Sequence, residues 1–189
     1  MTRHEPVALQ FGSVGQAYMW ALEAAQRPGV RSPTQMAIES MKENPRRGTL
    51  TRDDITDTAL SILMATNRIQ PVTARMTFRS VFGEPDNLID SIIAARVATS
   101  IQSGKPFAQV FRIAFLALVR LRFLEQRGER MPDAWYAHGL GIQRQSLASW
   151  RPIIEQAQAK LSEWLIQGKI KAREKLDRIG AMYGYDQAG

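Results

Sequence analysis

Apolar residues recur three or four positions apart along most of this chain, a spacing that predicts an almost entirely helical protein. Proline, glycine and short polar stretches separate the helical segments. The segments with this pattern cover residues 13–26, 32–42, a stretch beginning at 51, 71–82, 87–102, 107–125 and 152–180. The predicted fold is therefore all-α, a multi-helix bundle with a long C-terminal helix.

The same spacing identifies the expected core. The positions expected to be buried in the helices beginning near 51, 71 and 87 are Ile55, Ala59, Leu60, Ile62, Leu63, Val72, Met76, Phe78, Val81, Leu88, Ile89, Ile92, Ile93, Val97 and Ile101. Residues 107–125 are apolar on nearly all sides, which predicts a helix at the centre of the core. In the last helix, Gly168 interrupts the apolar stripe. A glycine there either allows a neighbouring helix to approach closely or marks a bend or an end.

Residues 133–150 have the pattern of a helix-turn-helix unit, which we expect in the C-terminal half of the bundle. Ala137 is small where the two helices of such a unit cross, and Gly141, four positions later, tolerates the positive φ of the turn. Leu147 then points back into the core from the second helix, and Trp150 flanks it. These four residues form the expected core of the motif.

The outward face of the second motif helix carries polar side chains that suit base edges and phosphates. The expected DNA-binding residues are Gln143, Arg144, Gln145, Ser146, Ser149 and Arg151. The first three would meet base edges, and the last three would anchor phosphates. A structural corner between two helices of a bundle needs the same small residue and the same glycine, so this alternative stays open.

The charge balance favours a polyanionic partner. The formal net charge is +7. When lysine and arginine neutralise phosphates, counterions are released, and this release favours binding. Arg46 and Arg47, in a polar loop, are candidate outlying contacts. The basic residues on the outer face of the last helix are Lys160, Lys169, Lys171, Arg173, Lys175 and Arg178. Because acidic residues alternate with them, we expect a solvated face with a mild basic bias.

The sequence contains none of the motifs that we examined for enzymes and metal sites. The chain has no cysteine, which excludes disulfides, thiolate metal sites and cysteine catalysis. His4 and His138 lack companion ligands, so no zinc site is expected. The Gly-Lys pair at 104–105 lacks the earlier glycine and the preceding strand of a nucleotide-binding loop, and helix capping explains the aspartates within 53–57. We therefore expect a protein that is not an enzyme and that uses no metal or cofactor.

The length of 189 residues allows one substantial core or two small ones. We expect an N-terminal helical subdomain at 1–85 for partner docking or dimerisation, a helix-turn-helix domain with the C-terminal helix at 86–180, and a flexible tail at 181–189. The stripe of the last helix suits packing along its own domain or a seam with a second copy, which leaves a homodimer open. No apolar run approaches the roughly 20 residues that span a bilayer, and the first residues lack a secretory apolar region, so a cytoplasmic protein is expected.

The span from 92 to 167 resembles the phage late-gene antitermination proteins of the Q type. The shared elements are a hydrophobic helix that ends in a polar break after residues 121–125, the turn unit at 137–150, and a following amphipathic helix at 153–167. The resemblance implies binding to a promoter-proximal DNA element and loading onto RNA polymerase. It carries over only the outward motif positions, which are Gln143, Arg144, Gln145 and Ser149.

These observations predict a DNA-binding transcription regulator, and two other functions stay open. The first is a helical subunit of a nucleoprotein complex that binds RNA or single strands through basic faces, such as a small subunit of an RNA-guided effector. The second is a protein-interaction adaptor that uses the long striped helix. Sequence-dependent duplex binding would distinguish the regulator from both.

Overall fold

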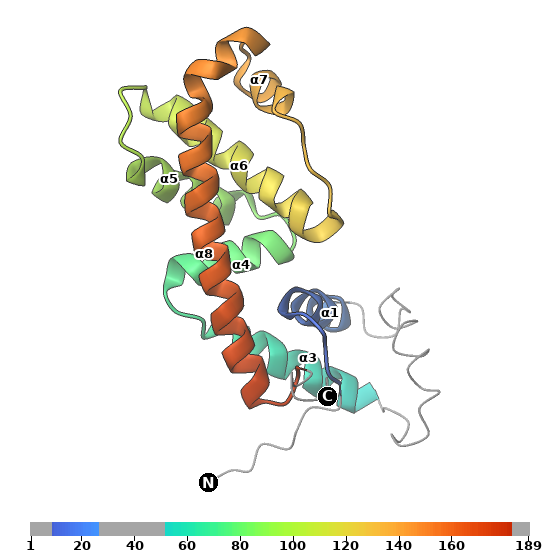
Figure 1. The fold of residues 1–189 in the computed structure, drawn as a ribbon. Coiled ribbons are helices and arrows are strands. Elements are labelled where there is room, and N and C mark those ends of the chain that lie inside the picture. The colour runs from blue at the N-terminus through green and yellow to red at the C-terminus, as the bar shows by residue number, and fades with distance from the viewer. Residues whose placement is uncertain (1–8, 27–51, 183–189) are drawn as a thin grey trace, which may run out of the picture. The chain divides into compact units, whose positions relative to one another are not determined.

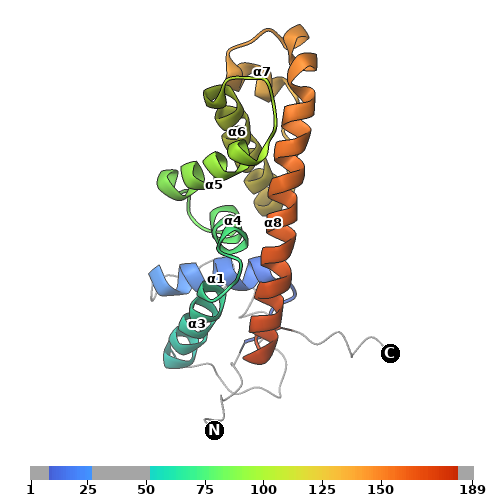
Figure 2. The same ribbon diagram turned by 90° about the vertical axis from the view of Figure 1, so that its left-hand side faces the viewer.

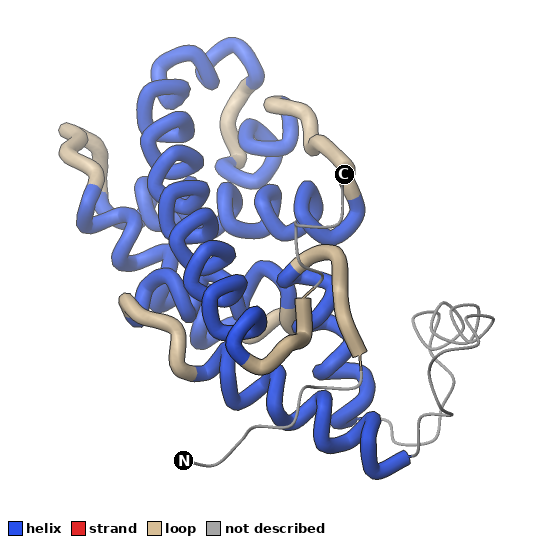
Figure 3. The backbone as a smooth tube through the Cα atoms, turned by 60° about the horizontal axis from the view of Figure 1, so that its bottom comes forward, coloured by secondary structure: helices blue, strands red, loops and turns tan. Residues whose placement is uncertain are grey.

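The computed structural model describes residues 9–26 and 52–182, and all of its secondary structure in these ranges is helical apart from one isolated bridge (Figures 1 and 3). The elements are α1 (Val14–Gln26), α3 (Arg52–Asn67), α4 (Val72–Phe82), α5 (Asn87–Ser100), α6 (Phe107–Arg127), α7 (Ala134–Leu140), the 3₁₀ helix η2 (Arg144–Trp150) and α8 (Arg151–Arg178). The predicted all-α fold with a long C-terminal helix is confirmed. The helix expected at 32–42 lies outside the described residues. Within the described residues, none of these helices is long and apolar enough to cross a bilayer.

The chain divides into two units. The first combines the residues up to Ile69 with those from Lys169 onward, and the second is the continuous stretch Gln70–Gly168. Helix α8 therefore contributes residues to both units. The division that we expected at residue 85 falls inside the second unit, because α4 packs against α5 and α6.

The first unit is built around α1 and α3, which pack against each other. Trp20 is buried on α1, and its ring lies 5.2 Å from that of Phe11. The Phe11 backbone N–H donates to the carbonyl oxygen of Ala181 at 2.9 Å, and Phe11 forms an isolated parallel bridge with Met182. Ala181 and Met182, which we expected in a flexible tail, are therefore buried and paired. Residues 183–189 of that expected tail lie outside the described residues.

In the second unit, α6 lies against α4, α5 and α7 (Figure 2). Local chemistry sets the helix ends. The Asp86 carboxylate accepts hydrogen bonds from the backbone N–H groups of Leu88 and Ile89, which caps the start of α5. Gly128 ends α6 in the left-handed conformation, at φ 69°.

About half of the expected core positions are buried, and four are exposed. The buried ones are Ala59, Ile62, Phe78, Val81, Ile93, Val97 and Ile101, and the half-buried ones are Ile55, Leu63, Met76 and Ile89. Leu60, Val72, Leu88 and Ile92 are exposed, with Leu88 70% accessible. The expectation was wrong for these four because apolar spacing identifies a stripe on a helix without showing how much of its width a neighbour covers.

Helix α6 is less completely buried than its composition predicted. Phe107 at its start is 54% accessible and Leu124 near its end is also exposed, whereas Ile113 and Leu118 in its middle are fully buried. Its buried face also includes a charged side chain, Arg122. The helix therefore combines an apolar centre with one buried cation, which the apolar pattern did not indicate.

Arg122 is held in a buried network with Asp90 of α5 and Ser80 of α4. Its Nη2 donates to both carboxylate oxygens of Asp90, at 2.8 and 2.7 Å, and its Nε donates to the Ser80 carbonyl oxygen at 2.7 Å. The Ser80 hydroxyl donates to Asp90 Oδ1 at 2.6 Å. The network thus joins three helices, and hydrogen bonds accompany both buried charges.

Gly168 lies where α8 packs against α4 within the second unit. A Cβ atom at this position would lie 2.8 Å from the carbonyl oxygen of Ala74 and 3.0 Å from the Cβ of Phe78. Helix α8 continues through Gly168 without ending. Of the two roles that the sequence left open for this glycine, the structure shows the close approach of a neighbouring helix.

Candidate nucleic-acid interface

The turn of the motif has the predicted backbone conformation. Gly141 is left-handed at φ 68° and ends α7. Its N–H donates to the carbonyl oxygen of His138, and the N–H of Ile142 donates to that of Ala137, at 3.1 and 3.0 Å. These two bonds form the Schellman arrangement, which satisfies carbonyl groups at the helix end. Ala137 is buried, as the motif requires.

Tyr136 anchors α7 to the rest of the second unit. Its side chain is fully buried, and its hydroxyl accepts a hydrogen bond from Gln158 Nε2 on α8 at 2.9 Å. The guanidinium of Arg120, on α6, lies 5.5 Å from the centre of the Tyr136 ring. The bulky tyrosine fits at this position because Arg120 of α6 contacts its ring and Gln158 of α8 bonds its hydroxyl.

Burial raises the pKa of Tyr136 above its ordinary value of 10.0, although the hydrogen bond from Gln158 and the nearby Arg120 act in the opposite direction. The folded protein therefore holds this proton more tightly than the unfolded chain does. Stability from this group is fully present below about pH 10 and is lost as the pH rises through the raised folded-state value.

We expect Tyr136→Phe to lose about 1 kcal/mol at neutral pH, because Gln158 loses its acceptor. The variant should also lose part of the alkaline decline in stability. Urea unfolding of both proteins at about pH 8 and about pH 11 measures the two effects. An equal alkaline decline in wild type and variant would contradict the link between this hydroxyl and stability.

The second helix of the motif differs from the expected form. Residues 144–150 form a 3₁₀ helix that continues directly into α8, rather than a separate α-helix followed by a restart at Pro152. Pro152 has no N–H to bond the carbonyl of Ala148, and its ring would clash with that carbonyl in an α-helix. The Arg151 N–H bonds the Ala148 carbonyl instead, which is the tighter 3₁₀ pattern.

The 3₁₀ geometry determines which side chains share a face, because positions three apart are aligned. Leu147 is buried and fixes η2 to the unit, while Trp150, which we expected in the motif core, is only half-buried. All six expected DNA-binding positions are exposed: Gln143, Arg144, Gln145, Ser146, Ser149 and Arg151. Gln145 and Arg151 fall on one row, and Ser146 and Ser149 on the next.

The exposed residues differ in whether their side chains already form hydrogen bonds or ion pairs within the protein. Ser149 donates its hydroxyl proton to the Ser146 carbonyl oxygen at 2.9 Å, so it can offer only an acceptor. Arg151 Nη2 lies 3.9 Å from an Asp133 carboxylate oxygen. The side chains of the first three positions, 143–145, have no hydrogen-bond or ion-pair partner in the described part of the chain. They are therefore the groups most available to a ligand.

Lys105 belongs to this surface, although nothing in the sequence pattern indicated it. It lies in the loop between α5 and α6, and its Nζ is 4.6 Å from the centre of the Trp150 ring. A lysine 45 positions before the tryptophan could be found only from the folded structure. We use the name η2 surface for Lys105, Gln143, Arg144, Gln145, Ser146, Ser149, Trp150 and Arg151.

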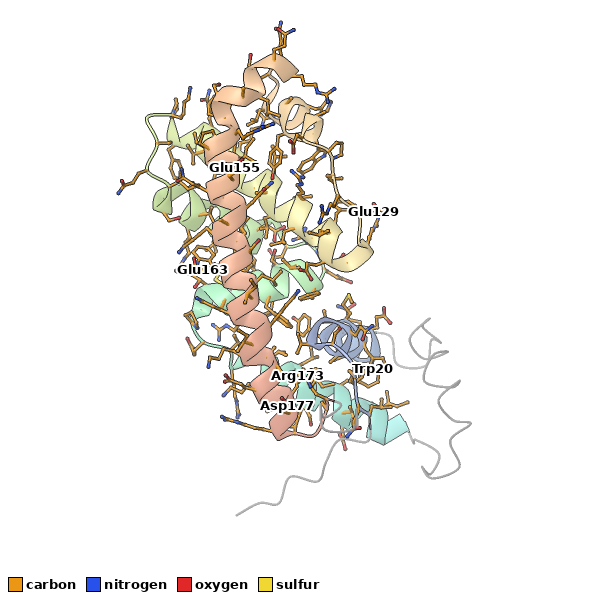
Figure 4. All side chains as sticks on the ribbon, in the orientation of Figure 1. Trp20, Glu129, Glu155, Glu163, Arg173 and Asp177 are labelled. Carbon is orange, nitrogen blue, oxygen red and sulfur yellow. The ribbon has the colours of Figure 1, made fainter. Side chains whose placement is uncertain are left out.

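The other expected basic contacts contribute less. Ion pairs within α8 join Lys160 to Glu163, Lys171 to Glu174 and Arg173 to Asp177; Figure 4 labels Glu163, Arg173 and Asp177. These pairs reduce the charge that the helix presents, in line with a solvated face. Arg46 and Arg47 lie outside the described residues. His138 is exposed, and no group of three histidine, aspartate or glutamate side chains in the described ranges could hold a metal ion.

Comparison with known proteins adds no family to this geometry. No protein-family model matches the chain, and no curated protein or solved structure matches it. The resemblance to Q-type antitermination proteins stays a prediction from the sequence.

Proposed function

We propose that this protein is a DNA-binding transcription regulator that contacts duplex DNA through the η2 surface. One observation carries the proposal. The turn at Gly141 brings η2 against α7 so that Leu147 is buried, while the side chains at 143–145 are exposed and unengaged in the described structure. A merely structural corner would not require three adjacent polar side chains to be left available.

The chemistry of these side chains suits base and phosphate recognition. Glutamine can bond both N6 and N7 of adenine, and arginine can bond both O6 and N7 of guanine. Arg151 and Lys105, whose Nζ lies over the Trp150 ring, are the proposed phosphate contacts, and the net charge of +7 supports electrostatic association. An antiterminator role, RNA polymerase as a partner and a cytoplasmic location are parts of the proposal that only the sequence supports.

Fluorescence anisotropy with random duplex DNA, single-stranded DNA and RNA, each at two salt concentrations, tests the proposal. We expect the duplex to bind most tightly, with a steep loss of affinity at higher salt. That result would justify selecting a target sequence. If none of the three probes binds at low salt, the proposal is contradicted, and the protein-interaction adaptor becomes the favoured function.

Once a target sequence is selected, we expect Arg144→Ala to weaken specific binding by about 1–3 kcal/mol, because a bidentate contact to guanine is lost. The fold should be unchanged, since the side chain is exposed. Arg96→Ala, at an exposed arginine on α5, is the matched control for net charge. Equal losses in both variants would show a general charge effect and would sink the assignment of Arg144.

A second candidate is the subunit that binds RNA or single strands. The observation that favours it is the half-buried Trp150 with Lys105 above its ring, an aromatic and basic pair of the kind that stacks unpaired bases. The short 3₁₀ form of η2 also differs from the α-helix that fits the major groove. Tighter binding to single strands than to duplex in the anisotropy experiment would select this candidate.

A further inference from the structure

The second unit contains a cavity of about 220 Å³ between α6 and α8, and no residue of η2 is in its lining. Its lining consists of Ala117, Arg120, Leu121, Leu124, Arg130, Gln158, Leu161 and Ser162. Four of these residues are apolar, and the other four are polar or cationic. The volume is below the range of about 300–1,000 Å³ that holds drug-sized ligands, so it suits a smaller molecule.

We propose that this cavity binds a small organic acid, with an apolar body against the leucines and a carboxylate at Arg120 and Arg130. The apolar requirement follows from Leu121, Leu124 and Leu161 in the lining. The anionic requirement follows from two arginines in a lining without any acidic residue.

The two arginines are available in different ways. Arg130 lies in the loop after α6 and has no ion-pair partner among the described residues. Arg120 already binds a carboxylate, because its Nη1 donates to Asp133 Oδ1 at 3.1 Å. That contact shows that a carboxylate is a suitable partner for Arg120 in this position. Arginine binds such groups through parallel N–H donors, with more specificity than a lysine would provide.

Phenylacetate is a suitable probe, because it joins an apolar ring to one carboxylate. Phenylacetamide has the same shape without the charge, and acetate has the charge without the apolar body. In titration calorimetry or ligand-observed NMR with the full chain, we expect phenylacetate to bind with a Kd of about 1 mM or tighter. Phenylacetamide and acetate should bind at least about tenfold more weakly.

Arg130→Gln should weaken phenylacetate binding at least about tenfold, because it removes a charge-assisted contact. Arg127→Gln is the matched control, since Arg127 stacks 5.0 Å from the Phe123 ring and does not line the cavity. Both positions are exposed, so thermal melting should show that both variants fold like wild type. The proposal is overturned if phenylacetate fails to bind at about 10 mM, binds no better than phenylacetamide or acetate, or responds equally to the two substitutions.

Binding in this cavity would also act on α7. Arg120 and Gln158 line the cavity and hold Asp133 and Tyr136 at the same time, so a ligand carboxylate that takes Arg120 competes with Asp133. Trp135 of α7 packs edge-on against Tyr136, with ring centres 5.8 Å apart. We expect phenylacetate to change the tryptophan fluorescence, and Trp135→Phe to abolish that change. A change that survives Trp135→Phe would contradict the coupling to α7.

An effect of the ligand on DNA binding rests on the proposed function. Repeating the duplex anisotropy titration with saturating phenylacetate tests it, and a shift in duplex affinity is the expected result. Direct ligand binding without any duplex binding would show that the cavity site is right and the proposed function wrong. Duplex binding without direct ligand binding would support the proposed function and show that the cavity site is wrong.

Discussion

Replacing Asp90 with alanine is expected to lower the free energy of unfolding by about 3–5 kcal/mol. Asp90 is 1% accessible and is the counter-ion of Arg122, which is itself buried against α4 and α5. The substitution leaves the guanidinium charge in a desolvated position with only the oxygen atoms of Ser80 as partners. Urea denaturation followed by far-ultraviolet circular dichroism measures the loss.

Two controls separate the buried ion pair from a general effect of charge. Glu163→Ala removes one partner of the exposed Lys160–Glu163 pair on α8, and it should cost less than about 0.5 kcal/mol. The double variant Asp90→Leu/Arg122→Met removes both buried charges and should recover most of the stability lost in Asp90→Ala. If Asp90→Ala costs no more than Glu163→Ala, the network does not stabilise the unit as described.

Gly168→Val should destabilise the second unit by about 3 kcal/mol, the upper end of the usual cost of overpacking. Its Cβ would lie 2.8 Å from the Ala74 carbonyl oxygen, a backbone atom that cannot move without shifting α4. The loss should exceed the gain in helix propensity, which is a few tenths of a kcal/mol when valine replaces glycine. Urea denaturation again provides the measurement.

Ala159→Val, at an exposed position of the same helix, measures the cost of a β-branched residue without a clash and should stay below about 1 kcal/mol. Gly139→Ala offers a second comparison, because its Cβ would meet the tip of the Leu116 side chain rather than backbone. That side chain can rotate, so this change should be nearly neutral. A loss in Gly168→Val no larger than in Ala159→Val would show that α4 and α8 do not approach as closely as the structure has them.

Local signals in the sequence predicted the elements well. The proline and glycine boundaries placed α4, α5 and α6 to within two residues, and Gly141 was assigned the left-handed turn that it adopts. These successes share a cause, since helix ends and turns depend on residues close together in the chain. The all-α fold followed from the same local evidence.

Features that depend on distant residues were not predicted. Asp90 and Arg122 are 32 positions apart, and no spacing rule connects them. The exposure of Leu88 depends on which neighbour covers α5, and Lys105 reaches the η2 surface only through the packing of its loop. The 3₁₀ form of residues 144–150 is a different case, because Pro152 gives a local signal for it, although the pattern predicted a separate helix beginning at residue 152.

The bond between Phe11 and Ala181 affects the order in which the chain can fold during synthesis. The first unit needs residues from both sides of the second one, so it stays incomplete until residues 169–182 have left the ribosome. Residues 70–168 form a continuous stretch and are available earlier. Domains usually fold in order from the N-terminus, whereas here the second unit, which is continuous in sequence, can form before the first. Until then, Phe11, whose ring packs against Trp20, lacks its backbone partner at Ala181, and this apolar pair is open to chaperones and to other nascent chains.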